Sequence, residues 1–217
     1  MKKQNKIFIS SIFLLVSVCF LSSFSIVSSE SKTDEIFMSR ISMLMKDNVI
    51  PKREGMIISL GDFDDLCLTY NKYQITPLLE AKHFVFYSNL AWSSTTDKTD
   101  FLKSGCGVVM HYSPETNDSI VMSLRMDGNI YFDGIKNLKS FSLGSYYFQP
   151  QALEDTVELL VVVDGDKSVV YIDGSRIVTK ANLPVMGSYF GLCSISGAYQ
   201  SNAGTRCTFN DMFLYTW

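Results

Sequence analysis

Few residues in this sequence have the types and spacing that catalysis or metal binding requires. His83 and His111 are the only histidines, and neither has an evident serine or cysteine partner that it could activate as a nucleophile. Four of the five cysteines follow residue 29, and the sequence contains no Cys-x-x-Cys pair, so a zinc site lacks its usual ligands. No phosphate-binding glycine loop leads from a strand into a helix. The sequence therefore offers no nucleophilic, zinc or nucleotide site.

Aromatic side chains in loops are a second group with usable chemistry, because their flat faces stack on sugar rings. Tyr146 and Tyr147 lie in "SYYF", in a stretch interrupted by glycine and proline. Trp92 ends an apolar segment, and Tyr199 lies in the polar segment "SGAYQSNAG". We predict that these four residues bind a ligand if their loops gather at one end of the fold. The alternative is that they belong to the core, as most of the 13% aromatic residues must.

The first 29 residues have the pattern of a secretory signal peptide. A basic segment, "MKKQNK", precedes an uncharged apolar stretch at residues 7–27, and small residues follow before Glu30. We predict cleavage before Glu30 and a protein that is secreted or displayed at the cell surface. The alternative is an uncleaved membrane anchor at residues 7–27, since about 20 apolar residues can span a bilayer.

The charge balance excludes one class of partner. The whole chain has a formal net charge of −3, and removal of residues 1–29 would take away three lysines and no acid. An acidic surface without a basic run disfavours nucleic acid and anionic membranes as partners. A membrane contact is expected only through the N-terminal segment, if that segment stays uncleaved.

The remaining chain divides into a short helical segment and one β domain. Within residues 30–54, apolar residues recur at helical spacing over 33–48, acids lie in the first turn, and Pro51 follows. Residues 55–217 read almost entirely as short strands, and the Asp-Gly pairs at 164–165 and 173–174 favour tight hairpins. About nine or ten strands at this spacing predict an all-β sandwich or barrel.

The order of three segments resembles a known fold family. "LLVVVDGDKSVVYIDGSRIV" (159–178) is followed by "SYFGLCSISG" (188–197) and then by the closing strand "TRCTFNDMFLYTW" (205–217). This order resembles the concanavalin A-like, laminin G-like jelly roll, and it is most similar to bacterial secreted domains of the 3-keto-disaccharide hydrolase (DUF1080) type. The resemblance implies an antiparallel β-sandwich over residues 55–217, preceded by a short helix.

The resemblance also implies a disulfide, because the last strand of such a sandwich pairs beside early strands. Cys207 begins the last strand and Cys106 begins an early one, so we predict a bond between them, with the glycines beside Cys106 allowing a close backbone approach. A second bond between Cys67 and Cys193 is the less favoured possibility, since both could be small core residues. Alternation within residues 207–217 places Phe213 on the same, core-facing side as Cys207, interrupted by a bulge at the aspartate between them.

The acids of this sequence fit the enzymes of the resembled fold poorly. Jelly-roll glucanases use a strand with Glu-x-Asp-x-x-Glu, whose acids share one face. "ALEDTVELL" has Asp155 and Glu158, but not in that order. Laminin G-like domains often bind calcium at the rim, for which Asp164 and Asp166 are candidates, although turn formation alone explains both. We therefore expect no cofactor, with calcium at these two aspartates as the less favoured alternative.

From these patterns we expect a non-catalytic exported module that binds carbohydrate at the cell surface. One alternative is a divergent glycan or 3-keto-disaccharide hydrolase, which would depend on Asp155 and Glu158. The other is a structural envelope protein or a protein–protein interaction module without a small ligand. The ligand itself is not encoded in any motif of the sequence.

Overall fold

The computed structural model of the protein describes residues 32–67, 71–94, 101–197 and 204–217. Its contacts divide the chain into two units, Met1–Ile36 and Phe37–Trp217. The predicted signal peptide and Tyr199 lie outside the described residues, so the structure does not test them. No helix in the described ranges has the length and apolarity needed to cross a membrane.

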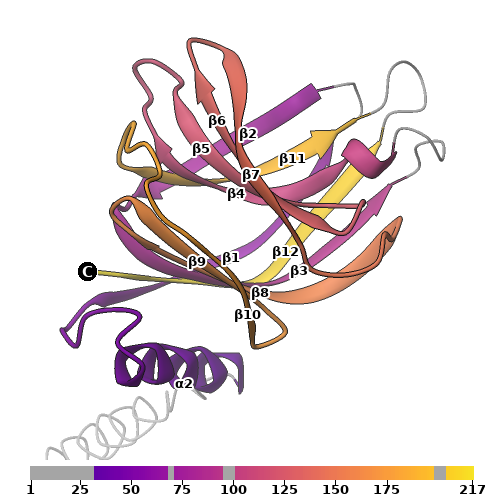
Figure 1. Ribbon diagram of the computed structural model, residues 1–217. Coiled ribbons are helices and arrows are strands. Elements are labelled where there is room, and N and C mark those ends of the chain that lie inside the picture. Colours follow the sequence, from indigo (N-terminus) through magenta and orange to yellow (C-terminus); the bar gives the residue numbers. More distant parts are fainter. Residues whose placement is uncertain (1–31, 68–70, 95–100, 198–203) are drawn as a thin grey trace, which may run out of the picture. The chain divides into compact units, whose positions relative to one another are not determined.

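Two antiparallel six-stranded sheets stack face to face, as Figure 1 shows. Sheet A has the order β1-β12-β3-β8-β9-β10. Its strands, in chain order, are β1 (Met56–Cys67), β3 (His83–Ser94), β8 (Glu154–Asp164), β9 (Lys167–Ile172), β10 (Ser175–Lys180) and β12 (Thr205–Thr216). Sheet B has the order β2-β11-β4-β5-β6-β7. Its strands are β2 (Asn71–Glu80), β4 (Gly105–Tyr112), β5 (Ser119–Arg125), β6 (Asn129–Lys136), β7 (Lys139–Tyr147) and β11 (Tyr189–Ser196).

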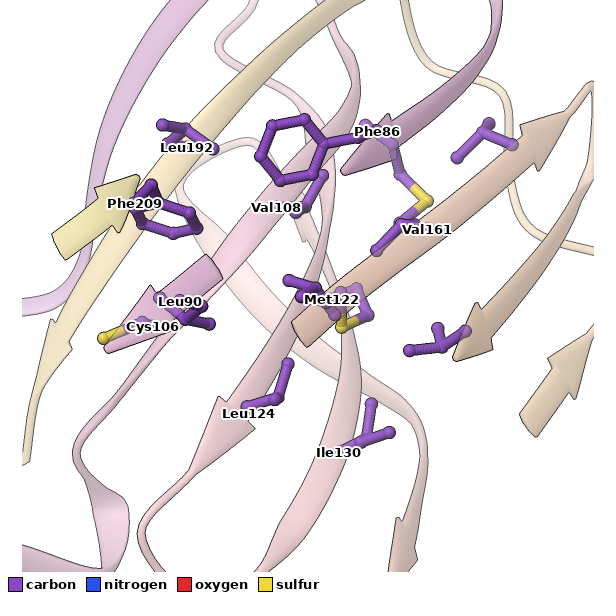
Figure 2. Close-up of a cluster of buried hydrophobic side chains, with 14 of the residues drawn as sticks. Phe86, Leu90, Cys106, Val108, Met122, Leu124, Ile130, Val161, Leu192 and Phe209 are labelled. Atoms are coloured by element: carbon purple, nitrogen blue, oxygen red, sulfur yellow. The ribbon is translucent and has the colours of Figure 1, made fainter. Parts of the chain in front are cut away.

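The core forms between the sheets because alternate residues of each strand point inward. Sheet A contributes Phe86, Leu90, Val161 and Phe209, and sheet B contributes Val108, Met122, Leu124, Ile130 and Leu192, as Figure 2 shows. All of these side chains are at most 1% exposed. The predicted all-β sandwich is therefore confirmed, with twelve strands among the described residues.

The disulfide between Cys106 and Cys207 is present and joins β4 of sheet B to β12 of sheet A. The Cα atoms of the two cysteines are 5.7 Å apart. The glycine at 107 serves a different close approach from the one predicted. A Cβ there would lie 2.2 Å from the backbone oxygen of Met122, so only glycine lets β4 and β5 come together at this point.

The strand β7 (Lys139–Tyr147) is the main difference from the predicted strands, since the sequence pattern places Tyr146 and Tyr147 in a loop. Its sequence "KSFSLGSYY" is rich in serine and its burial pattern is mostly exposed, as suits an edge strand with little hydrophobic signal. It pairs with β6 along its whole length, with a register shift beside Gly144, whose φ is 134°. Tyr146 and Tyr147 therefore lie in a strand.

A bulge in β12 confirms one prediction and overturns another. The register with β3 shifts between Asn210 and Phe213, and Asp211 between them has a φ of 53°. The extra residue reverses the alternation. Before the bulge Phe209 faces the core, but after it Leu214 does, so Phe213 points to the outer face of sheet A and not into the core as predicted.

The predicted N-terminal helix is α2 (Lys32–Lys46), and its apolar stripe packs on the outer face of sheet A. Phe37, which is 1% exposed, lies against two aromatic rings of that face. Its centroid is 5.8 Å from that of Tyr87 and 5.4 Å from that of Phe213. Arg40 Nη2 donates to Glu158 Oε1 over 2.8 Å beside this contact. The reversed alternation after the β12 bulge thus supplies an aromatic contact for the helix.

Candidate functional site

Sheet B curves strongly toward its outer face, as one hydrogen bond requires. Tyr73 Oη, from β2, donates to Asp133 Oδ2, from β6, over 2.8 Å. The strands β11, β4 and β5 lie between β2 and β6 in the sheet. In a flat sheet β2 and β6 would be about 19 Å apart, at about 4.8 Å per strand, beyond the reach of these two side chains. The outer face of sheet B is therefore hollow.

The floor of this hollow is a small apolar cluster separate from the sandwich core. It consists of outward-pointing residues from β4, β5, β6 and β11, none more than 8% exposed: Val109, Val121, Ile135, Cys193 and Ile195. Tyr73, Ile75 and Tyr112 pack against this floor from the sides. An outer sheet face with buried apolar residues and tyrosines at its margins is suited to a ligand with both apolar and hydroxyl surfaces.

A pocket of about 410 Å³ opens on this face, within the range of roughly 300–1,000 Å³ typical of small-ligand sites. The lining comes from β2, β4, β6 and β7 and from the turns at one end of the sheet. It comprises Tyr73, Ile75, Tyr112, Asn117, Ile135, Leu138 and Ser140. Among the described residues, the lining contains hydroxyl and amide groups but no charged side chain.

Two loops are tied together at this pocket. Tyr112 Oη donates to Asn117 Oδ1 over 2.8 Å, within the β4–β5 connection. The backbone N–H of Asn137, in the β6–β7 turn, donates to Asp118 Oδ1 over 2.8 Å. Leu138 follows in that turn with a φ of 61° and is 84% exposed, which is unusual for a leucine in both respects. Strained, exposed residues of this kind gather at binding sites.

A chain of polar contacts crosses the hollow beside the pocket. Arg125 Nη2 donates to Asp133 Oδ2 over 2.7 Å, and Tyr73 donates to the same oxygen. The Arg125 guanidinium also lies over the ring of Tyr131, 4.2 Å from its centroid, and Tyr131 Oη donates to Asp127 Oδ2 over 2.6 Å. We call the Tyr73–Asp133–Arg125 contacts the bridge. The Arg125 and Asp133 side chains are only 14% and 11% exposed.

Burial fixes the protonation of the groups on this face. It raises the pKa of Tyr73 well above its ordinary value, and the charge and hydrogen bond of Asp133 add to that effect. Burial and the hydrogen bond to Asp127 raise the pKa of Tyr131 to about 12. Burial likewise raises the pKa of the Cys193 thiol to about 12. Both tyrosines therefore stay hydrogen-bond donors at neutral pH, and the thiol stays protonated.

Three of the four aromatic residues predicted to bind a ligand are described, and they lie apart from one another; Tyr199 is outside the described residues. Trp92 is 4% exposed and packs in the core, and its indole Nε1 donates to the backbone oxygen of Ala152. It also forms part of the lining of a second pocket, of about 380 Å³, together with Glu154 and Asp155. Tyr146 packs edge-on against Phe132 at a centroid distance of 6.1 Å, on the core side. Tyr147 is 66% exposed. Its register with Asn129 places it on the outer face of sheet B, on the side of the bridge away from the pocket.

The predicted acids do not form a catalytic pair. Glu158 lies on the outer face of sheet A, bonded to Arg40 of α2. Asp155 is three positions earlier in the same strand, where alternation directs it to the other side, and it accepts a hydrogen bond from Gln149. A retaining pair of carboxyl groups must lie about 5 Å apart on one face, which these positions do not provide.

The structure adds no ligands to the calcium prediction. Asp164 Oδ1 is 2.7 Å from His83 Nδ1, and Asp166 lies in the adjoining β8–β9 turn. Across the described ranges, no group of three or more His, Cys, Asp and Glu side chains is placed to hold a metal ion. Calcium binding stays a prediction.

No bond joins Cys67 to Cys193, which corrects the second predicted disulfide. Cys193 belongs to the floor on the outer face of sheet B. Cys67 ends β1 in sheet A, where its partner in the register is Thr205. Ser194, next to Cys193, points the other way and donates to Asp65 of β1. The Cys193 thiol therefore faces away from β1, and a bond to Cys67 would have to pass through sheet B.

Sequence reasoning missed the residues that form the pocket and bridge. A usable signal existed in "SLRM" and "YFDGI", where Arg125 and Asp133 interrupt two otherwise apolar strands with opposite charges. Charged residues in a strand that faces protein on both sides must be paired. The partner strands, however, depend on the register, and the contribution of Tyr73 depends on the curvature of the sheet. Neither is visible in a local pattern.

No protein-family model matches the sequence, and no curated protein sequence does either. Solved structures do match. A protein of A. japonicus, CB05, has a TM-score of 0.50 at 16% identity; the match covers 76% of this chain and 26% of that one. The carbohydrate-binding module CBM66 of Bacillus subtilis has a TM-score of 0.48 at 12% identity, covering 73% of this chain and 90% of that one. Galectin LEC-6 of Caenorhabditis elegans has 0.42 at 11%, covering 70% and 96%.

The chain thus spans about a quarter of the A. japonicus protein that it matches, and at 16% identity that likeness shows the fold alone. In this chain two antiparallel sheets stack on each other, and the last strand, β12, pairs between the early strands β1 and β3. The chain has the concanavalin A-like jelly-roll fold that the order of its strand segments predicts.

Proposed function

We propose that this protein is an exported, non-catalytic module that binds carbohydrate in the pocket on the outer face of sheet B. The observation that carries the proposal is the pocket lining. Two tyrosines, an asparagine and a serine surround an apolar floor, in a volume of about 410 Å³. Sugars present apolar ring faces and hydroxyl edges, which this combination of aromatic, aliphatic and neutral polar groups complements.

The fold and the disulfide support the same proposal. Double-sheet jelly rolls are used by lectins, although fold alone does not assign a function. The Cys106–Cys207 bond suits an oxidising compartment, as does the predicted signal peptide. Export of the protein is part of the proposal.

A hydrolytic role has less support because the acids near the pocket are already engaged. The pocket lining contains no carboxylate. Among the described acids near the pocket, Asp133 is paired with Arg125, and Asp118 accepts from the backbone N–H of Asn137. A general acid needs a carboxyl group with a raised pKa that can reach the glycosidic oxygen.

The test is a binding and turnover assay on the full-length chain produced through an oxidising secretory route. Immobilised inulin, amylose, β-1,3-glucan, xylan and mannan represent neutral glycans, and alginate and polygalacturonate represent acidic ones. Retention on a neutral glycan without released sugar supports the proposal. Released sugar supports the hydrolase, and a folded protein that none of the glycans retains overturns carbohydrate binding.

A pair of matched variants ties retention to this pocket. Leu138→Asp places a carboxylate at the pocket on a side chain that is 84% exposed, so the fold should tolerate it while a neutral sugar loses its apolar contact. Leu66→Asp makes the same change on a 46% exposed leucine of β1, in the other sheet. Retention should fall at least about tenfold with the first variant and stay unchanged with the second. Equal losses would place the binding site elsewhere.

A further inference from the structure

The bridge divides the hollow of sheet B into two compartments along the strand direction. In the register of β5 and β6, Asp133 lies opposite Val121, and Ile135 of the pocket lies opposite Ser119. In the other direction along β6 come Tyr131 and then Asn129, which lies opposite Tyr147. The pocket and Tyr147 are therefore on opposite sides of the bridge.

The bridge is built as a fixed wall. Two donors from different strands, Tyr73 and Arg125, converge on one carboxylate oxygen over 2.8 and 2.7 Å. The ion pair is nearly buried, with side chains 14% and 11% exposed, and the ring of Tyr131 lies beneath the guanidinium. Opening it would leave a buried carboxylate and a buried guanidinium without their partner, which is strongly unfavourable. A ligand in the pocket meets this wall instead of displacing it.

The position of the wall decides which part of a glycan can enter. A polysaccharide that binds through an internal stretch needs a groove that is open at both ends, because the chain continues in both directions. The pocket is bounded by Tyr73 on the side of the bridge, and its other lining residues lie toward the β4–β5 connection and the β6–β7 turn. The bridge therefore bounds the pocket on the side toward Tyr147, and the turns lie at its other end.

We propose that the pocket binds the terminal residues of a neutral glycan chain and not an internal stretch. This inference rests on the carbohydrate-binding function proposed above. The neutrality of the ligand follows from the lining, which has hydroxyl, amide and apolar groups and no cation to pair with a uronate or sulfate. The preference for a chain end follows from the bridge, which stops the chain after the residues that fill about 410 Å³.

The first experiment compares binding capacity at two chain lengths. Inulin, amylose and β-1,3-glucan are each prepared as a short fraction and a fraction about five times longer, and the full-length protein bound at saturation is measured per gram of glycan. Recognition of ends predicts a capacity about fivefold lower for the longer fraction, since chain ends per gram fall by that factor. Equal capacity for both fractions overturns the inference while leaving carbohydrate binding intact. Absence of binding to every glycan overturns the proposed function and the inference with it.

The second experiment uses variants at the wall. Tyr73→Ala removes the side chain that closes the pocket, so capacity should become independent of chain length. Tyr73→Phe removes only the hydroxyl and keeps the ring, and Tyr171→Phe removes a tyrosine hydroxyl that accepts from Arg176 in sheet A. Both should keep the dependence on chain length. If Tyr73→Ala keeps it as well, the bridge is not what selects chain ends.

Tyr147 provides an independent test of whether the ligand passes the bridge, because it lies on the far side of the bridge from the pocket and is 66% exposed. A chain that runs through the hollow would stack on this ring, whereas a chain end held in the pocket would not reach it. Tyr147→Ala should therefore leave the affinity for the short fraction within about twofold, against the loss of about tenfold or more expected for a stacking contact. A loss of that size would show that the ligand passes the bridge.

Discussion

The outer faces of the two sheets differ in how their aromatic and charged side chains are covered and paired. Both carry aromatic residues and an ion pair in partly buried positions, which a sheet face open to water would not need. On sheet A, Tyr87 and Phe213 are covered by Phe37 of α2, and Glu158 is paired with Arg40 of the same helix. On sheet B, the partners of Arg125 and Tyr73 come from the sheet itself.

On sheet A the helix contact should contribute mainly to stability, whereas sheet B carries the pocket that we propose as the binding site. The helix covers the part of sheet A around Tyr87 and Phe213, and a separate pocket of about 380 Å³ lies elsewhere on that sheet, lined in part by Ala91, Thr156 and Thr208. Sheet B instead curves until its own strands β2 and β6 meet through the bridge, and the pocket is left beside that contact. Substitutions on the two faces should therefore have different consequences, and the following experiments test that expectation.

The largest effect should come from the disulfide, which both faces share because it joins the two sheets. Its cysteines are 101 positions apart, and closing a loop of that size constrains the unfolded chain by up to about 4.7 kcal/mol. Replacing both Cys106 and Cys207 by serine should lower the free energy of unfolding by several kcal/mol in urea denaturation. Adding a reductant to the wild-type protein should reproduce the loss. An unchanged denaturation midpoint in both cases would mean that the bond adds nothing to stability.

The next effect distinguishes the faces directly. Phe37→Ala should lower the free energy of unfolding by about 3 kcal/mol, because a ring that is 1% exposed leaves a cavity between Tyr87 and Phe213. Glycan retention per folded molecule should not change. Met38→Ala, at a neighbouring position that is 48% exposed, is the control and should have little effect on either quantity. Loss of binding in Phe37→Ala at full folding would show that the faces are coupled.

The same comparison shows what the sequence could reveal. The helix was predictable because its apolar stripe and acidic first turn are local signals, and Phe37, Ile41 and Leu44 are buried as that stripe requires. The disulfide followed from the resemblance and from the order of strands, which are also carried by the sequence. Local periodicity therefore accounts for most strands, for the all-β class and for the helix on sheet A, whereas the jelly-roll fold followed from the resemblance.

The pocket was not predictable because it depends on distances between strands. Tyr73 and Asp133 are 60 positions apart, and their contact requires both the strand order of sheet B and its curvature. The bulge in β12 was foreseen, but its effect on Phe213 was not, since one extra residue reverses every side chain after it. Tyr146 and Trp92 looked like loop aromatics only because β7 has few apolar residues and the end of β3 is polar.

The two arginine–aspartate pairs sharpen the comparison further. Arg125→Met should lower the free energy of unfolding by about 2 kcal/mol, because Asp133 would remain nearly buried without its cation. The control is Arg206→Met on sheet A, where Arg206 and Asp64 also lie 2.7 Å apart but have side chains 56% and 47% exposed. That exposed pair should contribute little. If both variants lose the same free energy of unfolding, burial does not determine how much the Arg125–Asp133 pair contributes to stability.

His111 offers a pH test where the two sheets meet, since the histidine of β4 lies near Gly165 in the β8–β9 turn. Burial lowers its pKa below the value of 6.5 expected for the unfolded chain, while the nearby His83 adds to this and Asp166 opposes it. The unfolded state then binds more protons, so this contribution to stability is complete above about pH 6.5 and is lost as the pH falls toward the folded pKa.

The measurement is the free energy of unfolding from pH 7.5 to pH 5. One such group changes it by at most about 1.4 kcal/mol per pH unit. His111→Asn keeps a residue that tolerates the observed φ of 55° and removes the titration. The slope between pH 6.5 and pH 5 should be smaller in the variant. If the free energy of unfolding falls with pH equally steeply in the wild type and in the variant, groups other than His111 cause the acid sensitivity of the protein.

The smallest effect on stability should be the one with the opposite sign. Leu138 has a φ of 61° and follows Asn137 at 51°, a pair of positive values that a tight hairpin turn requires and that suits Asn-Gly. Leu138→Gly should therefore raise the free energy of unfolding by up to about 1 kcal/mol, by relieving backbone strain. It should at the same time weaken glycan retention, because the leucine side chain lines the pocket. A gain in stability together with a loss of binding is expected where backbone strain is retained for function. The sheet A variant Phe37→Ala should differ, because it is expected to lower stability without changing binding. A variant that is more stable and binds equally well would show that the exposed leucine belongs to the turn and not to the site.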